Sequence, residues 1–383
     1  MERVSVALVG RFYEPHIAGA EISTRRLSRA LVGAGVPCEV ITTRFSSDLP
    51  RDRVESGVRV RRLSTVPGRL SRPVEFTRAF LYLVRNGGRF TIVQADCLSA
   101  LSLGAILGGR IRGARTIVGV CTAEPEGDIS RIRRMTGGPL VWRLFRAADA
   151  FVARGVANEE DLHRAGVRRG RIVRLPEIVP VTSRTHADAA GRTAARAALG
   201  LPERASVLYV GRLSEPKGVD VLLDAWAMVR ASRSASLLLV GDGPLAARAR
   251  AVAASDPGFS IVVAGLRTDV ERWSEAAEVF AFPSRTETFG LALAEAMGRG
   301  LAVVATPTGF VSDGFEDGVH GRVVPIGDAV ALAAALDELL ADDESRESLG
   351  VAAHAFVAAR FSTSVALDAH LALYRRLLSD AHA

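Results

Sequence analysis

A short segment near the middle of the sequence carries two positive charges in a glycine-containing loop. Val210 to Gly218 reads Val-Gly-Arg-Leu-Ser-Glu-Pro-Lys-Gly, and it follows the apolar run Val207–Val210. This pattern predicts the end of a strand, then a loop and a helix. In open α/β sheets, ligands bind outside the carboxyl ends of the strands. The planar fork of Arg212 and the compact ammonium of Lys217 would complement each other on a diphosphate.

Lysine is almost absent from this protein. Lys217 is the only lysine in 383 residues, and the other 48 basic residues are arginine. A single lysine retained in this loop indicates a requirement for the ammonium group there. Chance placement is the alternative.

A second segment, Ser284 to Gly298, places two carboxylates around an expected helix start. Glu287 and Glu295 are separated by seven residues, and Gly290 lies where a loop should enter the helix. The free N–H groups and positive dipole of that helix start suit phosphate oxygens or hydroxyl groups. Carboxylates accept hydrogen bonds from vicinal hydroxyls, so one could hold a sugar ring and the other a ribose. Solvated acids are the alternative, but Glu295 lies in an otherwise apolar run.

Taken together, the two segments resemble the retaining GT-B glycosyltransferases of family 4. The family's phosphate motif, G-R-x-x-x-x-K-G, matches Gly211 to Gly218, and its E-x7-E motif matches Glu287 and Glu295. The resemblance covers nearly the whole chain and implies that Arg212 and Lys217 bind the diphosphate of a nucleotide-sugar donor. It also implies that Glu287 holds the transferred sugar and Glu295 the ribose. Arg212, Lys217 and Glu287 are therefore the expected catalytic residues.

The resemblance implies further donor contacts. The expected contacts through backbone or small residues are Gly19, Gly211, Phe289, Gly290 and Leu291. Gly19 belongs to the N-terminal glycine loop, where a missing side chain lets the backbone approach the diphosphate. Arg267 is expected near the base of the nucleotide.

The acceptor is expected to contact the first half of the chain. His16 precedes the N-terminal glycine loop and is a candidate contact, with a structural loop histidine as the alternative. Family members often have a histidine near the transferred sugar at the position where this chain has Cys121, followed by Thr122. Arg133 and Arg134 are the remaining candidates.

The sequence also departs from the family in two loops. Pro-Glu-Ile-Val-Pro at 176–180 replaces the common P-N-G-V-D segment, and Gly309-Phe310 replaces a paired glycine. These departures concern the acceptor and the orientation of the sugar, whereas the diphosphate motif is intact.

Apolar runs of four to seven residues alternate with segments of helical period, as in β-α-β units with a parallel sheet. The expected strands are 4–9, 39–42, 92–95, 116–120, 150–153 and 172–175 in the first half, and 207–210, 237–240, 261–263, 279–282 and 302–305 in the second. Helices are expected between them and at 330–359 and 364–379.

Length and pattern predict two domains, because 383 residues exceed what one hydrophobic core usually spans. The alternation lapses between 176 and 191, which indicates a linker. We expect an acceptor-binding domain over 1–185 and a donor-binding domain over 186–361, with a last helix at about 362–383 packing back on the first. With the resemblance, the expected fold is α/β of the GT-B type: two Rossmann-like domains whose parallel sheets face a cleft.

Charge is distributed unevenly along the chain. Residues 1–190 hold 31 arginines and 18 acidic residues, whereas the rest of the chain is net acidic. Such a basic half suggests an anionic partner, either an acidic acceptor or the anionic inner face of a membrane, with a merely solvated surface as the alternative. Nucleic acid is disfavoured because only 6% of the residues are aromatic.

The remaining composition favours a cytoplasmic protein. The cysteines, Cys38, Cys97 and Cys121, form no C-x-x-C pair, and no apolar run is long enough for a spanning helix. The sequence has no D-x-D motif, and we expect neither a metal nor a cofactor besides the nucleotide-sugar co-substrate. The resemblance implies transfer of a hexose-type sugar to a hydroxyl acceptor with retention of configuration.

Parts of the sequence also fit three other functions. Gly241 to Ala246 fits G-x-G-x-x-A, the fingerprint of a dinucleotide-dependent dehydrogenase, but the strand expected at 261–263 lacks the acidic residue that this fingerprint requires. A sugar phosphorylase or epimerase of the same fold, or a non-catalytic nucleotide-sugar binding protein, stays open.

Overall fold

The computed structural model describes residues 4–16, 18–122, 127–182, 189–232, 235–255 and 260–380. The chain divides into two compact units. Unit 1 comprises Met1–Ile178 with Thr363–Ala383, and unit 2 comprises Val179–Ser362. The boundary expected at 185/186 lies outside the described residues.

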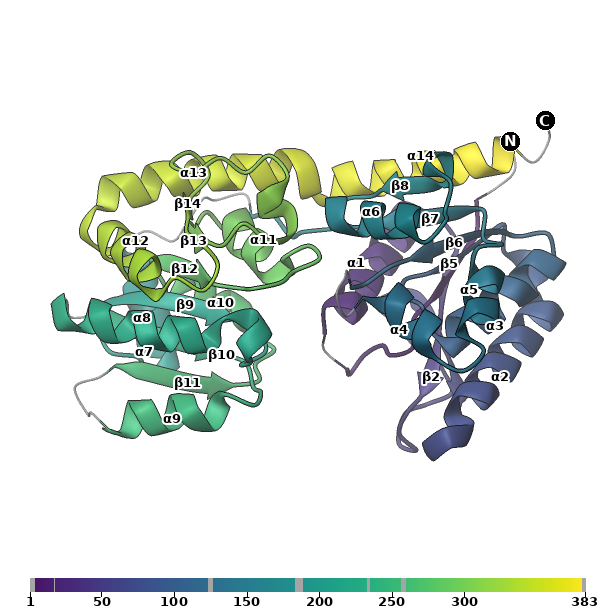
Figure 1. Ribbon diagram of the computed structural model, residues 1–383, viewed down its shortest axis with the longest axis horizontal. Helices are drawn as coiled ribbons and strands as arrows, with labels where there is room; N and C mark the ends of the chain where they lie inside the picture. The colour runs from purple at the N-terminus through teal and green to yellow at the C-terminus, as the bar shows by residue number, and fades with distance from the viewer. Residues whose placement is uncertain are drawn as a thin grey trace. The chain divides into compact units, whose positions relative to one another are not determined.

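Unit 1 is built on an eight-stranded sheet in the order β3-β4-β2-β1-β5-β6-β7-β8 (Figure 1). All neighbouring strands are parallel except β3 and β4. The strands are β1 Val6–Val9, β2 Cys38–Arg44, β3 Asp52–Glu55, β4 Val58–Ser64, β5 Ile92–Ala95, β6 Arg115–Gly119, β7 Ala150–Ala153 and β8 Ile172–Arg174.

Helices cover both faces of this sheet, as a buried parallel sheet requires. The helices are α1 Gly19–Gly33, α2 Ser71–Asn86, α3 Ala100–Ile111, α4 Asp128–Arg134, α5 Gly138–Phe145, α6 Val156–Arg164 and α14 Thr363–Ser379. One core joins the sheet to α2, α3 and α5, and the other joins it to α1 and α14. The Tyr374 hydroxyl on α14 donates a hydrogen bond of 2.7 Å to Gln94 Oε1 on β5, so the last helix is fixed to the centre of the sheet.

The hairpin of β3 and β4 was not predicted. Its turn has Ser56 at φ 48° and Gly57 at φ 80°, the positive values of a tight hairpin turn. Arg53, Arg59 and Arg61 alternate with valines, so these strands contain no continuous apolar run of the kind that marks the other strands. The charged side chains are balanced in part by Asp52, which forms ion pairs with Arg59 and Arg61.

Unit 2 is built on a six-stranded parallel sheet in the order β11-β10-β9-β12-β13-β14 (Figure 1). Its strands are β9 Ala205–Val210, β10 Ala235–Val240, β11 Ile261–Gly265, β12 Val279–Phe282, β13 Ala302–Ala305 and β14 Arg322–Val323. Its helices are α7 Ala189–Leu199, α8 Val219–Ser232, α9 Ala246–Ser255, α10 Val270–Glu275, α11 Leu291–Gly298, α12 Ala329–Ala341 and α13 Asp343–Phe361. One core contains α8, α9 and α12, and the other contains α10, α11 and α13.

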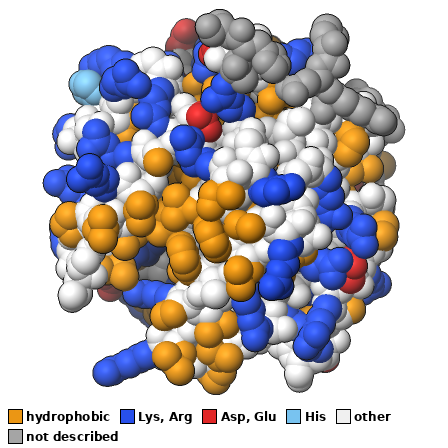
Figure 2. Space-filling model, turned by 90° about the vertical axis from the view of Figure 1, so that its right-hand side faces the viewer, with side chains coloured by type: hydrophobic (Ala, Val, Ile, Leu, Met, Phe, Trp, Pro, Cys, Tyr) orange, Lys and Arg blue, Asp and Glu red, His pale blue; other side chains and the backbone are white. Residues whose placement is uncertain are grey.

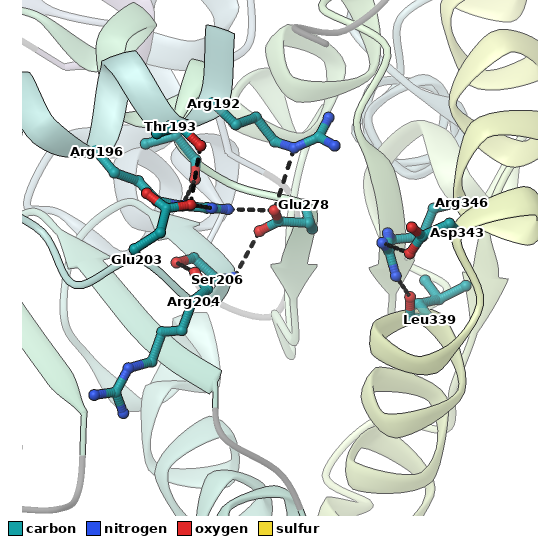
Figure 3. Close-up of polar contacts among 11 residues, drawn as sticks. Arg192, Thr193, Arg196, Glu203, Arg204, Ser206, Glu278, Leu339, Asp343 and Arg346 are labelled. Carbon is teal, nitrogen blue, oxygen red and sulfur yellow. Dashed lines mark hydrogen bonds and ion pairs between the residues drawn. The ribbon is translucent and has the colours of Figure 1, made fainter. Parts of the chain in front are cut away.

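A buried ion cluster fixes the amino ends of β9 and β12 (Figure 3). Glu278 precedes β12, pairs with Arg196 of α7 and accepts a 2.6 Å hydrogen bond from the Ser206 backbone N–H. Arg192 lies 3.3 Å from the same carboxylate, and Arg196 also contacts Glu203 at 2.9 Å. Because both carboxylate oxygens have partners, this buried charge is compensated. The carboxyl ends of these strands lie at the opposite edge of the sheet.

One helical stretch, Asp343–Ser379, is long and apolar enough to cross a bilayer by length and composition. It spans α13 and α14, which are separated at Ser362. Each helix contributes buried residues to a hydrophobic core of its own unit, for example Phe356 on α13 and Tyr374 on α14. We therefore interpret both as core helices.

Candidate functional site

The order of the strands in unit 2 places a switch point between β9 and β12. From β9 the chain proceeds outward through β10 and β11, whereas β12, β13 and β14 follow on the other side. The loops that leave β9 and β12 therefore diverge at the carboxyl edge of the sheet, where open α/β sheets bind ligands. These loops contain most of the first segment that the sequence singled out, 210–218, and the part of the second, 284–298, that precedes α11.

A lysine and a glutamate from these two loops are in contact. Lys217 Nζ lies 2.6 Å from Glu287 Oε1, and the Ser284 hydroxyl donates to the same oxygen at 3.2 Å. Both charged side chains are partly exposed, at 32% for Lys217 and 15% for Glu287. The ion pair holds the ammonium at the switch point with open surface beside it.

Two packing contacts fix the loop of Lys217 against the end of β12. Gly218 has φ 69°, and a Cβ there would lie 1.9 Å from the Pro283 carbonyl oxygen. Arg285 binds the Asp220 carboxylate through two bonds of 2.7 Å each. The Arg285 guanidinium holds the pKa of Asp220 below its usual value, so this bidentate pair stays charged at neutral pH. These contacts join the two loops without using Lys217.

A tyrosine lies beneath the same loops. The Tyr209 hydroxyl donates a 3.0 Å hydrogen bond to the Arg212 carbonyl oxygen. Burial raises the pKa of Tyr209, and the nearby Glu287 carboxylate raises it further. The phenol is therefore neutral, and it supports the backbone at Arg212 from inside the unit.

Helix α11 begins at the switch point, and aromatic side chains support its first turn. Gly290 caps the helix with φ 99°, a conformation that favours glycine. The Phe289 ring packs against Phe310 and Phe361, with ring centres 5.2 and 5.0 Å away. The Phe310 N–H donates to the Phe289 carbonyl at 2.9 Å, and a Cβ at Gly309 would lie 2.1 Å from that carbonyl oxygen. Gly309-Phe310 thus supports the loop that carries Glu287.

Comparisons with known proteins agree with this geometry. Residues 204–342 match the family model described as glycosyl transferases group 1, and residues 18–177 match a glycosyl transferase 4-like domain. The chain is 31% identical to a D-inositol 3-phosphate glycosyltransferase of Xylanimonas cellulosilytica, over 93% of this chain and 91% of that protein. The chain belongs to the glycosyl transferases group 1.

Other members and solved structures extend the comparison. An alpha-D-kanosaminyltransferase of Streptomyces kanamyceticus is 27% identical over 92% of this chain and 98% of that protein. Anabaena HepE, solved with UDP and glucose, superposes with a TM-score of 0.76 at 18% identity, covering 95% of this chain and 97% of that one. Sucrose-phosphate synthase of Thermosynechococcus elongatus gives 0.78 at 23% identity, covering 99% and 100%. The predicted GT-B class, with two parallel-sheet α/β domains, is confirmed.

Most of the predicted donor residues of this glycosyltransferase lie on the two loops at the switch point or on α11. Lys217 and Glu287 are in contact, and the Phe289 to Leu291 backbone forms the adjoining helix start. Glu295 lies just over one turn into α11 and is half-buried. The Arg212 guanidinium follows Gly211 and is exposed, and no ion pair within the described ranges joins it to Glu287.

Arg267 lies apart from this group. It follows β11, the edge strand two places from β9, and forms a bidentate pair with Asp269 at 2.9 Å. Its guanidinium also lies 5.8 Å from the Trp273 ring centre. No contact in the described part of the chain joins Arg267 to the Lys217–Glu287 pair.

The predicted acceptor residues all lie in unit 1, in the segments that follow the carboxyl ends of β1 and β6. His16 stacks on Phe12 at 4.8 Å, and Gly19 is the first residue of α1, with open space where a Cβ would be. The backbone N–H groups of Cys121 and Thr122 donate to Asp128 Oδ2 at 3.0 and 3.2 Å. Arg133 and Arg134 are exposed on α4.

A cavity of about 570 Å³ opens at the same edge of unit 1. Arg11, Phe12, Arg44 and Phe45 line it together with several serine and threonine side chains. His16 borders it through its contacts with Phe12 and Phe45. Arginines, hydroxyls and aromatic faces together suit a polar, anionic ligand that carries a ring. Among the predicted residues, His16 is therefore placed with this cavity.

Sequence reasoning missed the residues that position the site. Arg285 and Asp220 join loops 65 residues apart in the chain, which no local pattern reveals. Tyr209 and Ser284 each contact a residue only three positions along the chain, but neither belongs to the two motifs. The glycines of the G-x-G-x-x-A segment also have a packing role. A Cβ at Gly241 would lie 1.9 Å from the Gly211 carbonyl oxygen, so that loop is glycine-containing because it packs on the loop after β9.

Proposed function

We propose that this glycosyltransferase moves a hexose-type sugar from a nucleoside diphosphate sugar to a hydroxyl acceptor, with retention of configuration and without a metal ion. The contact of Lys217 with Glu287 at the switch point, beside the start of α11, carries the proposal. A cation, a helix N-terminus and a carboxylate at one point match a diphosphate joined to a hydroxyl-rich ring.

The reaction breaks the bond between the anomeric carbon and the diphosphate, so negative charge develops on the leaving phosphate. Lys217, Arg212 and the N-terminus of α11 supply positive potential that needs no reorganisation during the reaction. Glu287 accepts hydrogen bonds from the sugar hydroxyls and Glu295 from the ribose. The acceptor oxygen forms the new glycosidic bond on the face that the phosphate leaves, and its proton passes to the leaving phosphate.

For the acceptor, we propose a phosphorylated polyol bound in the unit 1 cavity. The relatives include D-inositol 3-phosphate glycosyltransferases, and their name refers to a phosphorylated ring. Arg44 and Arg11 line the cavity, and Arg11 stays 42% exposed beside its buried partner Glu75, so both guanidinium groups can bind a phosphate. The hydroxyl side chains of the cavity can bind a polyol. We propose that the protein works in the cytoplasm, with unit 1 in contact with an anionic partner.

A panel of nucleotide sugars tests the donor proposal. UDP-hexoses head the panel because HepE was solved with UDP, and each donor is compared with its free nucleotide in a thermal-shift experiment. Release of nucleoside diphosphate, faster with inositol phosphate than without it, is the expected result. Nucleotide binding without turnover on any donor and acceptor would instead indicate a non-catalytic binding protein, and release of a sugar phosphate would indicate a phosphorylase.

A further inference from the structure

The face of unit 1 formed by α2, α3 and α5 exposes apolar side chains in an area bordered by arginines (Figure 2). Leu140 on α5 is 64% exposed and Leu81 on α2 is 39% exposed. Phe76 and Phe80 stack at 6.1 Å and are only partly buried. We name this area the α2–α3–α5 surface. Exposed apolar areas of this kind mark interaction sites.

Close packing of α2 on α3 makes this surface rigid. A Cβ at Gly104 on α3 would lie 2.2 Å from the Phe76 carbonyl oxygen on α2, and one at Gly108 would lie 2.7 Å from that of Phe80. The glycines therefore bring the two helix backbones into direct contact. The side chains of α2 are consequently presented outward from a fixed base.

The arginines on this surface have no acidic partners. Arg78, Leu81 and Arg85 follow the spacing i, i+3, i+7 and form one exposed stripe on α2. Arg143 on α5 is exposed as well, and within the described residues none of these three arginines forms an ion pair. The acidic residues of α2, α4 and α5 are Glu75 and Asp128, which are buried and paired with Arg11 and Arg131.

We propose that the α2–α3–α5 surface docks unit 1 on an anionic membrane. Leucine and phenylalanine side chains insert at the boundary between headgroups and acyl chains, while the surrounding arginines meet anionic headgroups. Unit 1 as a whole carries 32 arginines against 19 acidic residues, so its long-range field attracts the same surface. This partner does not depend on which sugar unit 2 binds.

Flotation of the full-length protein with lipid vesicles tests the proposal. The protein is expected to float with vesicles of phosphatidylcholine and phosphatidylglycerol and to stay in solution with phosphatidylcholine alone. Raising the ionic strength from about 0.1 M to about 1 M shortens the screening length from about 10 Å to about 3 Å and is expected to release it.

Matched variants locate the contact. The triple variant Arg78→Gln, Arg85→Gln, Arg143→Gln is expected to weaken partitioning about a hundredfold, roughly fivefold for each arginine. Its control, Arg248→Gln, Arg250→Gln, Arg272→Gln, removes three exposed arginines of unit 2 and is expected to leave partitioning nearly unchanged. The pair Leu81→Ser, Leu140→Ser is expected to weaken partitioning at least roughly tenfold by removing the inserted apolar groups.

Two results would overturn the proposal. One is equal flotation with anionic and neutral vesicles, which would also be the outcome if the surface served an acidic protein. The other is an equal loss in the two triple variants, as a merely solvated arginine surface predicts. Donor hydrolysis in solution is expected to be the same in the wild type and in the triple variant of α2 and α5. If only the membrane proposal is wrong, both proteins still hydrolyse the donor. If the proposed reaction is wrong, neither the wild type nor the triple variant turns the donor over.

Discussion

Lys217 is the residue on which the proposed chemistry depends most. Its ammonium lies 2.6 Å from Glu287 in the loop before α11, where we propose that the leaving diphosphate gains charge. We expect Lys217→Ala to lower kcat for donor hydrolysis a hundredfold or more, about 3 kcal/mol of transition-state stabilisation. Lys217→Arg keeps the charge but not the compact ammonium, so it should recover only part of the rate. A kcat within threefold of wild type in Lys217→Ala would contradict the assignment.

The thiols of unit 1 differ in their ionisation. A side-chain hydrogen bond with Cys121 lowers the pKa of the Cys97 thiol, and the Arg11 backbone N–H assists. The Cys121 thiol also donates to the Asp96 carbonyl oxygen at 3.0 Å. Desolvation raises the pKa of the Cys38 thiol. At neutral pH the thiolate fraction of Cys97 is therefore the larger, and the thiolate is the reactive form. We expect iodoacetamide to label Cys97 before Cys38, measured by peptide mass spectrometry.

The serine variant of Cys121 gives the control for this comparison. In Cys121→Ser a hydroxyl replaces the thiol as the hydrogen-bonding partner of Cys97, so the preference for Cys97 should persist. In Cys121→Ala that partner is gone, and labelling of Cys97 should slow. Labelling of Cys38 ahead of Cys97 in the wild type would show that the thiol contact does not control reactivity.

At the scale of single residues, the sequence predicted the residues proposed to act in the reaction better than the residues that hold their loops in place. Lys217 and Glu287 stood out because lysine is otherwise absent and because the two motifs have fixed spacings. Arg285 did not, although it binds Asp220 and Glu215 and so joins the two loops. One arginine among 48 carries no local signal. Its role depends on a partner 65 residues away, which only the fold reveals.

At the scale of elements, the strands with pure apolar runs were predicted most closely. The bounds of β5, β7, β12 and β13 agree with the expected ranges, because each is buried on both faces. The last helices were expected at 330–359 and 364–379, and the structure divides the first into α12 and α13. Asp342 makes the break by capping α13 through a 3.0 Å bond from the Ser345 N–H.

The loop between β9 and α8 depends on a glycine that no other residue replaces. Gly218 needs both a positive φ of 69° and the space beside the Pro283 carbonyl oxygen. We expect Gly218→Ala to lower the melting temperature and to reduce kcat at least roughly tenfold, because a 1 Å displacement of a catalytic group can cost a hundredfold in rate. Donor hydrolysis and thermal unfolding measure the two effects.

Gly200 supplies the matched control for this variant. It lies in the same unit with φ 65°, but no atom lies within 4 Å of where its Cβ would be. Gly200→Ala should therefore cost only the backbone strain of about 1 to 2 kcal/mol and leave kcat unchanged. Equal effects of the two variants on kcat would show that the contact with Pro283 does not position Lys217.

At the scale of the whole molecule, the two units have separate hydrophobic cores and opposite charge. Each unit has a core on both faces of its own sheet. Unit 1 is strongly basic, and the acidic excess of the chain lies in unit 2. The sequence predicted this asymmetry from composition. The sequence also suggested a membrane contact through this basic half, whereas the extent of the α2–α3–α5 surface depends on which helix faces the packing at Gly104 and Gly108 leaves exposed.

Separate cores lead to a prediction about unfolding. Calorimetry of the full-length protein should show two transitions, one for each unit. A nucleoside diphosphate should raise chiefly that of unit 2, because the charged groups proposed to bind it, Lys217 and Arg212, lie there. At a hundred times its Kd the ligand adds about 2.7 kcal/mol to the stability of the folded state, a shift of roughly 5 to 10 °C for a unit of this size. Lys217→Ala should reduce the shift without moving the other transition. If every nucleoside diphosphate in the panel left both transitions unchanged, or shifted the one that is insensitive to Lys217→Ala, the donor site would have to lie elsewhere.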